Sequence, residues 1–170
     1  MQQLGVINGR SILYTNIRND KGWFKELPKG NWAAFTITDD EDTDFIELVV
    51  ENSLENQVAY ICSAGQLSDQ VELAFDLKIV EKAIEQEDFT KIPYDYDQSP
   101  VTTAPKNFSE GFWFASFVVQ NEENWINRLI CLDFTKKGVK NNIISLIEKI
   151  NNNWLPSEEE IEPPFYDDNL

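Results

Sequence analysis

Acidic side chains are the residues in this sequence whose type and spacing could do chemistry. Between Gly30 and Leu77 the chain has no Lys or Arg, yet it carries eleven Asp and Glu residues. A surface of this kind attracts basic partners and speeds their association. Besides Asp76, the stretch holds the ten candidate partner-binding residues: Asp39, Asp40, Glu41, Asp42, Asp44, Glu47, Glu51, Glu55, Asp69 and Glu72.

Two other readings of these acids stay open. A run of charges also forms a solvated helix face, and acids near a helix start complement the helix dipole. Clustered oxygens are also the ligands that hard divalent cations prefer, so Asp39, Asp40 and Asp42 could hold such an ion. An enzyme that works through carboxylates alone needs two positioned carboxyl groups, and their geometry is not visible in a sequence.

The residues of most catalytic and cofactor sites are missing. The chain has no histidine, which rules out a Ser-His-Asp or Cys-His system in its usual form. Neither of the common glycine-rich nucleotide motifs occurs. Cys62 and Cys131 each lie in an apolar run, so we expect two reduced core thiols and no zinc site. We therefore predict no catalytic, cofactor-binding or metal-binding residues.

The net charge of −16 narrows the class of partner. Nucleic acids and anionic membrane surfaces would repel such a chain, so we expect neither as a partner. No apolar run is long enough to span a membrane, and the start of the chain does not resemble a signal peptide. These features predict a cytoplasmic protein with a basic protein partner. The oligomeric state is not indicated.

The elements that would position the acids follow a regular order. Asn8-Gly9 separates two short apolar runs, which predicts a β-hairpin at the start of the chain. Four strands are then predicted at about residues 32–37, 58–62, 100–103 and 127–134, each followed by a helix. This order predicts an α/β, three-layer fold: a mostly parallel four-stranded sheet with helices on both faces, plus the N-terminal β-hairpin adding antiparallel strands at one edge.

Two further expectations concern helix burial and the domain limits. For the second helix, which Ser68 would cap, the predicted inward stripe is Val71, Phe75, Ile79, Val80, Ala83 and Ile84. Residues 1–154 should form a single α/β domain, and residues 155–170 should form an acidic tail that contains proline and is extended or partly disordered. In open parallel sheets a ligand binds beyond the carboxyl ends of the strands, here after Thr38, Ser63, Thr103 and Thr135.

One segment resembles a known group of proteins. Val101-Thr102-Thr103, followed by Glu110-Gly111-Phe112-Trp113-Phe114, is similar to a family of small, uncharacterised bacterial α/β proteins with a V-x-T-T strand end and a helix that begins F-W-F. The resemblance covers about residues 32–134. Members often carry a Trp-His pair after the two threonines, where this chain has Ala104-Pro105. The resemblance therefore implies a fold and no reaction.

The overall profile of the chain also resembles bacterial toxin-immunity proteins, which are small, acidic, cytosolic and free of catalytic groups. This resemblance implies a non-enzymatic immunity protein that neutralises a basic toxin domain through its acidic surface. The alternative is a small-ligand or regulatory α/β domain that binds its ligand at the carboxyl ends of the strands, with a divalent cation at Asp39 and Asp40.

Overall fold

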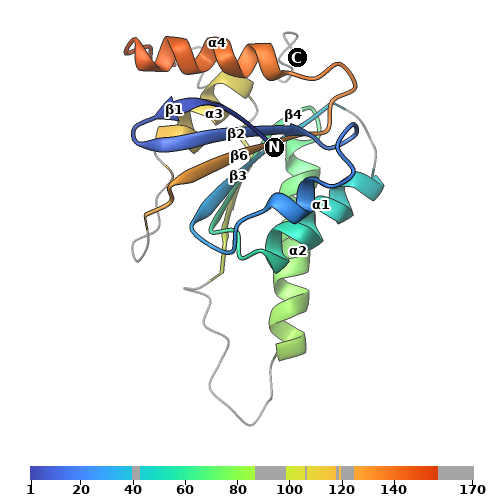
Figure 1. Ribbon diagram of the computed structural model, residues 1–170. Helices are drawn as coiled ribbons and strands as arrows, with labels where there is room; N and C mark the ends of the chain where they lie inside the picture. Colours follow the sequence, from blue (N-terminus) through green and yellow to red (C-terminus); the bar gives the residue numbers. More distant parts are fainter. Residues whose placement is uncertain (40–42, 87–98, 106, 118, 120–124, 157–170) are drawn as a thin grey trace.

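A six-stranded sheet forms the centre of the molecule (Figure 1). The structure is a computed structural model, and it describes residues 1–39, 43–86, 99–105, 107–117, 119 and 125–156. The strand order is β1-β2-β6-β3-β4-β5. The strands are β1 (Gln2–Ile7), β2 (Arg10–Asn16), β3 (Trp32–Thr38), β4 (Tyr60–Gly65), β5 (Val101–Thr103) and β6 (Arg128–Asp133).

Helices cover both faces of this sheet, as the sequence predicts. They are the short 3-10 helix η1 (Trp23–Glu26), α1 (Thr43–Glu55), α2 (Ser68–Gln86), α3 (Phe108–Phe117) and α4 (Lys140–Asn151). Successive residues of β3 point to opposite faces. Trp32 and Ala34 join the core under α1 and α2, whereas Ala33 and Phe35 join the core under α3 and α4. The mixed α/β fold and the mostly parallel sheet are therefore confirmed.

The strand count and the role of the hairpin differ from the prediction. The prediction is a four-stranded, mostly parallel sheet with the hairpin adding antiparallel strands at one edge; the observed sheet has six strands, and only β1 pairs antiparallel. Strand β2 runs parallel to β6, with Leu13 opposite Ile130. Residues 17–31 carry the chain from β2 past β6 to β3, which lies on the far side of β6 from β2, and this crossover contains only η1. No full helix marks this crossover, so the sequence pattern did not reveal it.

Arg10 connects the hairpin to the end of α3. Its side chain is buried, and its guanidinium donates hydrogen bonds to three backbone carbonyls: Ala115 at 2.7 Å, Val119 at 2.5 Å and Ile126 at 2.9 Å. Carbonyl groups at a helix C-terminus lack partners within the helix and carry partial negative charge. Burial lowers the pKa of this guanidinium. Arg10 therefore satisfies two carbonyls at or just beyond the end of α3, and it ties them to a third, that of Ile126, shortly before β6.

Close packing of α3 on the sheet explains the glycine in the E-G-F-W-F segment. A Cβ atom at Gly111 would lie 2.8 Å from the Pro105 side chain and 3.3 Å from the Phe35 ring. The rings of Phe108 and Phe112 each lie 5.6 Å from the ring of Phe35. The aromatic segment is therefore core on the side that faces β3.

Helix α2 is longer than the strand it follows. At about 1.5 Å per residue its 19 residues span roughly 28 Å, whereas the six residues of β4 span about 20 Å. Its C-terminal half consequently extends past the sheet (Figure 1). Val71 and Phe75 are buried as predicted, but Val80 and Ile84 are 48% and 59% exposed. The prediction that these two residues face inward is wrong, because they lie on the side of α2 that carries the exposed Leu73 and Leu77, away from its buried side.

Across the described residues, no helix combines the length and the apolar character needed to cross a membrane. The tail predicted for residues 155–170 lies outside the described residues from residue 157 onward.

Candidate functional site

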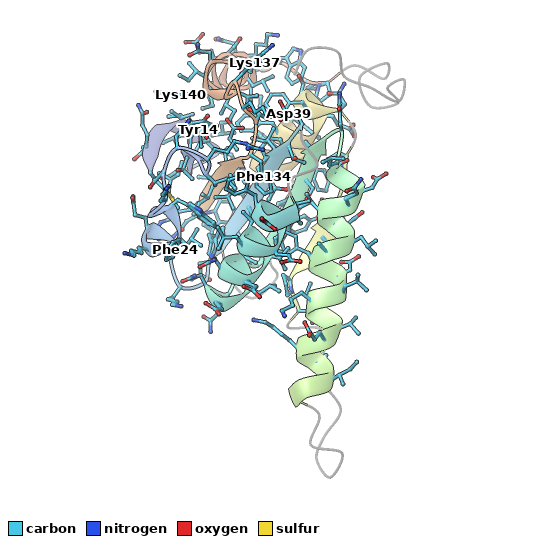
Figure 2. All side chains as sticks on the ribbon, turned by 90° about the vertical axis from the view of Figure 1, so that its right-hand side faces the viewer. Tyr14, Phe24, Asp39, Phe134, Lys137 and Lys140 are labelled. Atoms are coloured by element: carbon cyan, nitrogen blue, oxygen red, sulfur yellow. The ribbon has the colours of Figure 1, made fainter. Side chains whose placement is uncertain are left out.

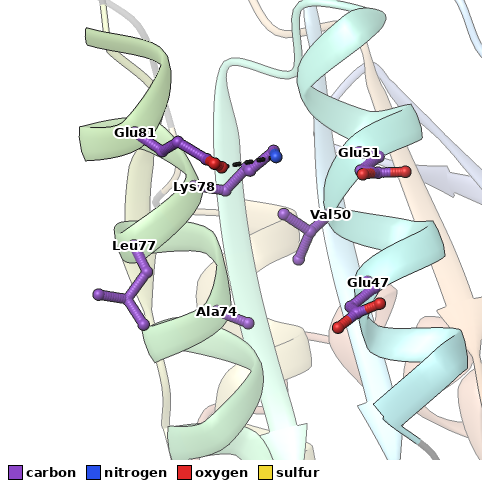
Figure 3. A pocket seen from close by; sticks show the side chains of 7 residues that line it. All are labelled: Glu47, Val50, Glu51, Ala74, Leu77, Lys78 and Glu81. Carbon is purple, nitrogen blue, oxygen red and sulfur yellow. Dashed lines mark ion pairs between the residues drawn. The ribbon is translucent and has the colours of Figure 1, made fainter. Parts of the chain in front are cut away.

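A groove of about 600 Å³ lies between α1 and α2 (Figure 3). Both helices cover the same face of the sheet, where their inner residues share one apolar core. The groove combines charged and apolar side chains, and its walls come from both helices. The lining residues are Glu47, Val50 and Glu51 from α1, and Ala74, Leu77, Lys78 and Glu81 from α2.

Helical spacing explains why these side chains meet. Glu47 and Glu51 are four residues apart, so they lie one turn apart on the same face of α1, and both are exposed. Val50 is buried, and it extends from α1 into the gap between the helices (Figure 3). Across the gap, Ala74 and the 62% exposed Leu77 add apolar surface. The groove thus has apolar walls beside two carboxylates.

The charge of the groove is negative. Three carboxylates line it, from Glu47, Glu51 and Glu81, against one ammonium group from Lys78. The Nζ atom of Lys78 forms an ion pair with Glu81 at 2.6 Å. Between described residues, no ion pair joins Glu47 or Glu51 to a basic side chain. Two carboxylates therefore face the solvent without a neutralising cation from this part of the chain.

The other candidate acids do not all join this groove. Asp44 and Glu55 are exposed on α1, so the acids of that helix run along its outer side. Glu72 belongs to a different group of acids on α2, together with Asp76 and Asp69. Burial and these two nearby carboxylates raise the pKa of Glu72. Asp76 accepts a hydrogen bond from the Thr102 hydroxyl of β5 at 2.6 Å, which places this group on the β5 side of α2. The predicted acidic set is therefore split between two sides of α2.

The acids after β3 give little support for a cation site. Asp39 is exposed, whereas Asp40, Glu41 and Asp42 lie outside the described residues. Figure 2 shows Asp39 and Lys137 toward the same end of the molecule, where the parallel strands end. In the ranges that the structure describes, no group of three or more acidic or cysteine side chains is placed to hold a metal ion.

The carboxyl edge of the sheet instead contains a buried carboxylate that the sequence analysis missed. Asp133 ends β6, and its Oδ1 atom accepts a hydrogen bond from the Thr135 amide at 2.8 Å. Its Oδ2 atom accepts from the Val139 amide at 2.9 Å and from the Tyr14 hydroxyl. Burial, followed by the bond to Asp133, raises the pKa of Tyr14. Each carboxylate oxygen thus has a partner within the fold. In the sequence, the signal for this buried acid was its position directly after the apolar run 129–132.

The two cysteines belong to the core, as the sequence predicts. Cys62 and Cys131 are buried in β4 and β6 and form no disulfide. Burial raises the pKa of the Cys62 thiol to about 12, and it raises the pKa of Cys131 as well. A thiol attacks as the thiolate, so these groups are inert at neutral pH.

Sequence analysis also missed an exposed apolar stripe on α2. Leu73, Leu77, Val80 and Ile84 are 56%, 62%, 48% and 59% exposed. The signal was present as a second apolar series in the helix, offset by two residues from Val71 and Phe75. Leu77 belongs both to this stripe and to the groove.

The fold and the groove thus define an α/β protein with an acidic, partly apolar surface between two helices. A family model described as "Domain of unknown function (DUF7684)" matches residues 12–150, and the chain belongs to this family. The expectation of an uncharacterised family is confirmed, while the V-x-T-T and F-W-F pattern and the toxin-immunity profile stay predictions. Neither the search of curated proteins nor the search of solved structures returned a match.

Proposed function

We propose that this chain is a non-enzymatic binding protein that holds a basic protein partner in the α1–α2 groove. The observation that carries the proposal is the position of Glu47 and Glu51 beside the apolar surface of Val50, Ala74 and Leu77. The more specific form of the proposal is an immunity protein that neutralises a basic bacterial toxin domain.

The groove suits a lysine or arginine side chain. Such side chains have an apolar stem and a charged end, and they pack the stem on apolar surface while the charge remains in a polar environment. The methylene groups would contact Val50 and Ala74, which face each other across the gap (Figure 3), and the cation would reach the carboxylates of Glu47 and Glu51. A charge-assisted hydrogen bond of this kind is about twice as strong as a neutral one. The groove therefore favours a cationic side chain over an anionic one.

The charge of the whole chain supports the same partner class. A net charge of −16 attracts a basic domain over a long range and repels polyanions. Among the described helices, α1 has no basic residue in its last turn, whereas α4 carries Lys140 and Lys149. The acidic character is therefore stronger on the α1–α2 side of the sheet than on the α4 side.

The experiment compares two charge reversals in a binding assay. The chain is co-expressed with the product of the neighbouring gene, and affinity is measured at low salt for the wild type, Glu51→Lys and Glu148→Lys. Glu51 and Glu148 are exposed helical residues on opposite sides of the sheet, so the two variants change the net charge equally.

We expect Glu51→Lys to weaken binding by about tenfold or more, because it places a cation where the partner's cation would lie. Glu148→Lys should change binding much less, since it alters only the overall charge. Equal losses from the two variants would contradict a role for the groove, and no binding at low salt would contradict the proposed function.

A further inference from the structure

The four exposed residues Leu73, Leu77, Val80 and Ile84 form a continuous line along α2. Their spacing is four, three and four residues, which repeats the seam by which two α-helices pack along each other. The line extends over about 16 Å at 1.5 Å per residue, or about three helical turns. Figures 1 and 2 both show the end of α2 standing clear of the sheet and the other described helices. With respect to the described residues, the seam is thus open to another helix.

The seam lies on a different side of α2 from the residues that pack into the core. Val71, Phe75 and Ala83 are buried on the side toward the body of the protein, while all four seam residues are between 48% and 62% exposed. The buried residues of α2 cover the sheet without help from the four seam residues. A helix that needed only to cover the sheet would carry polar residues at these four positions. Their apolar character therefore points to a second contact.

Acidic side chains border the seam on both sides. Glu81, which pairs with Lys78, flanks it on the groove side, and Glu47 and Glu51, which pair with no base among the described residues, lie behind it on α1. Asp76 flanks it on the β5 side, where it lies near Glu72. An apolar seam with acids along both borders is complementary to an apolar seam with bases along both borders.

We propose that the seam docks an amphipathic α-helix of the partner, with apolar residues at three- and four-residue spacing flanked by Lys or Arg. This inference rests on the proposed function and identifies the part of the basic partner that makes the contact. The apolar residues of that helix would pack on Leu73, Leu77, Val80 and Ile84. One of its cations would enter the groove between the carboxylates of Glu47 and Glu51.

A second copy of this chain is a poorer occupant. In a parallel pair of α2 helices, Asp76 would lie opposite Glu81 of the second copy, which brings like charges together on both borders. In an antiparallel pair the same acids would lie opposite Ala83 and Ala74 of the second copy, so no cation would meet them. Each copy also carries a net charge of −16. Charge complementarity therefore favours a basic helix over self-association.

The test uses three synthetic peptides with the full chain. The first is a helical peptide of about three turns with Leu at the seam positions and Lys on both borders. The second replaces each Lys by Glu, and the third keeps Lys but replaces each seam Leu by Ser. Affinity is measured by fluorescence anisotropy for the wild type, for Val80→Ser/Ile84→Ser, and for the control Val101→Ser/Leu155→Ser. The control residues are 52% and 66% exposed and lie outside α2.

We expect the first peptide to bind the wild type and the control equally, and to bind Val80→Ser/Ile84→Ser at least about tenfold more weakly. The second and third peptides should bind weakly to all three proteins. Circular dichroism and sedimentation of each protein show whether it is folded and whether it is a monomer.

Equal binding of the first and third peptides would overturn the proposal, because charge alone would then explain the affinity. A wild-type dimer that dissociates in Val80→Ser/Ile84→Ser would also overturn it, since the seam would then be covered by a second copy. With the co-expressed partner, the two claims separate. Weaker binding of Glu51→Lys with unchanged binding of Val80→Ser/Ile84→Ser, two seam residues outside the groove lining, overturns only the helix proposal. Unchanged binding of Glu51→Lys overturns the proposed function itself.

Discussion

The hydroxyl of Tyr14 donates a hydrogen bond to the buried carboxylate of Asp133, which joins the end of β2 to the end of β6. Asp133 also accepts hydrogen bonds from the backbone amides of Thr135 and Val139, and Val139 directly precedes α4. One carboxylate thus organises the turn from the central strand into the last helix. The strand ends that would be a ligand site in other α/β sheets are here, at β2 and β6, occupied by contacts within the chain.

Replacing Tyr14 by Phe should lower the free energy of unfolding by about 1–3 kcal/mol, because a buried carboxylate loses a donor. Urea denaturation followed by tryptophan fluorescence measures the change. Ser53→Ala is the control, since the Ser53 hydroxyl is buried and has no hydrogen-bond partner among the described residues. Its removal should leave stability unchanged or slightly higher. A loss in Ser53→Ala as large as that in Tyr14→Phe would contradict the account.

Replacing Arg10 by Met should cost about 3 kcal/mol or more, because three backbone carbonyls lose their donors at once. Methionine keeps much of the side-chain volume, so the loss reports the hydrogen bonds more than the packing. The largest effect should appear at the end of α3. Native-state hydrogen exchange measures it, and protection of α3 equal to that of the wild type would show that Arg10 is dispensable there.

Replacing Gly111 by Ala should destabilise the protein in spite of the better helix propensity of alanine. The gain in propensity is about 1 kcal/mol, whereas overpacking costs about 1–3 kcal/mol. The added methyl group would meet the Pro105 side chain at 2.8 Å and the Phe35 ring at 3.3 Å. Gly22→Ala is the matched control, because its nearest contact is 3.6 Å away. Thermal denaturation should show a lower midpoint for Gly111→Ala only, and a higher midpoint would contradict the tight packing.

Stability should fall in alkaline solution. Burial raises the pKa of Cys62 to about 12, and the pKa values of Cys131 and Tyr14 are raised too. A raised pKa in the folded state gives stabilisation that is complete below the unfolded pKa, about 8.5 for Cys and 10 for Tyr. That stabilisation is lost as the pH rises toward the folded pKa. Urea midpoints between about pH 7 and pH 11 should therefore decline above about pH 9.

A Cys62→Val variant should show a shallower decline than the wild type over the same range. In the native wild type at pH 8, neither thiol should react with a disulfide reagent, and both should react after denaturation. Fast reaction of either thiol in the native protein would contradict their burial.

The sequence predicts the central elements well where burial is continuous. Strands β3, β4 and β6 are short apolar runs buried on both faces, and each precedes an amphipathic helix. The parallel pairing of β2 could not be predicted, because its crossover contains only η1 and therefore lacks a helical pattern. The exposure of Val80 and Ile84 was predicted wrongly, because α2 carries two apolar series and the sequence alone does not show which of them faces the sheet.

The candidate site is predictable in part. The periodicity of α1 places Glu47 and Glu51 on one face, but it does not reveal that Leu77 and Lys78 lie across from them. Pairing of α1 with α2 is a tertiary contact, and the sequence records only that each helix has an apolar side. The separation of Glu72 from Glu47 has the same origin, because it depends on which side of α2 faces β5.

The salt dependence of association with the co-expressed partner tests the central claim most directly. Stopped-flow rates are measured for the wild type, Glu51→Lys and Glu148→Lys between about 0.02 and 0.3 M salt, a range over which the screening length shortens several-fold. The account predicts that the wild-type rate falls by about tenfold or more, and that Glu51→Lys is slower and less salt-dependent than Glu148→Lys. A salt-independent wild-type rate, or identical curves for the two variants, would contradict the claim that the α1–α2 groove receives a basic partner.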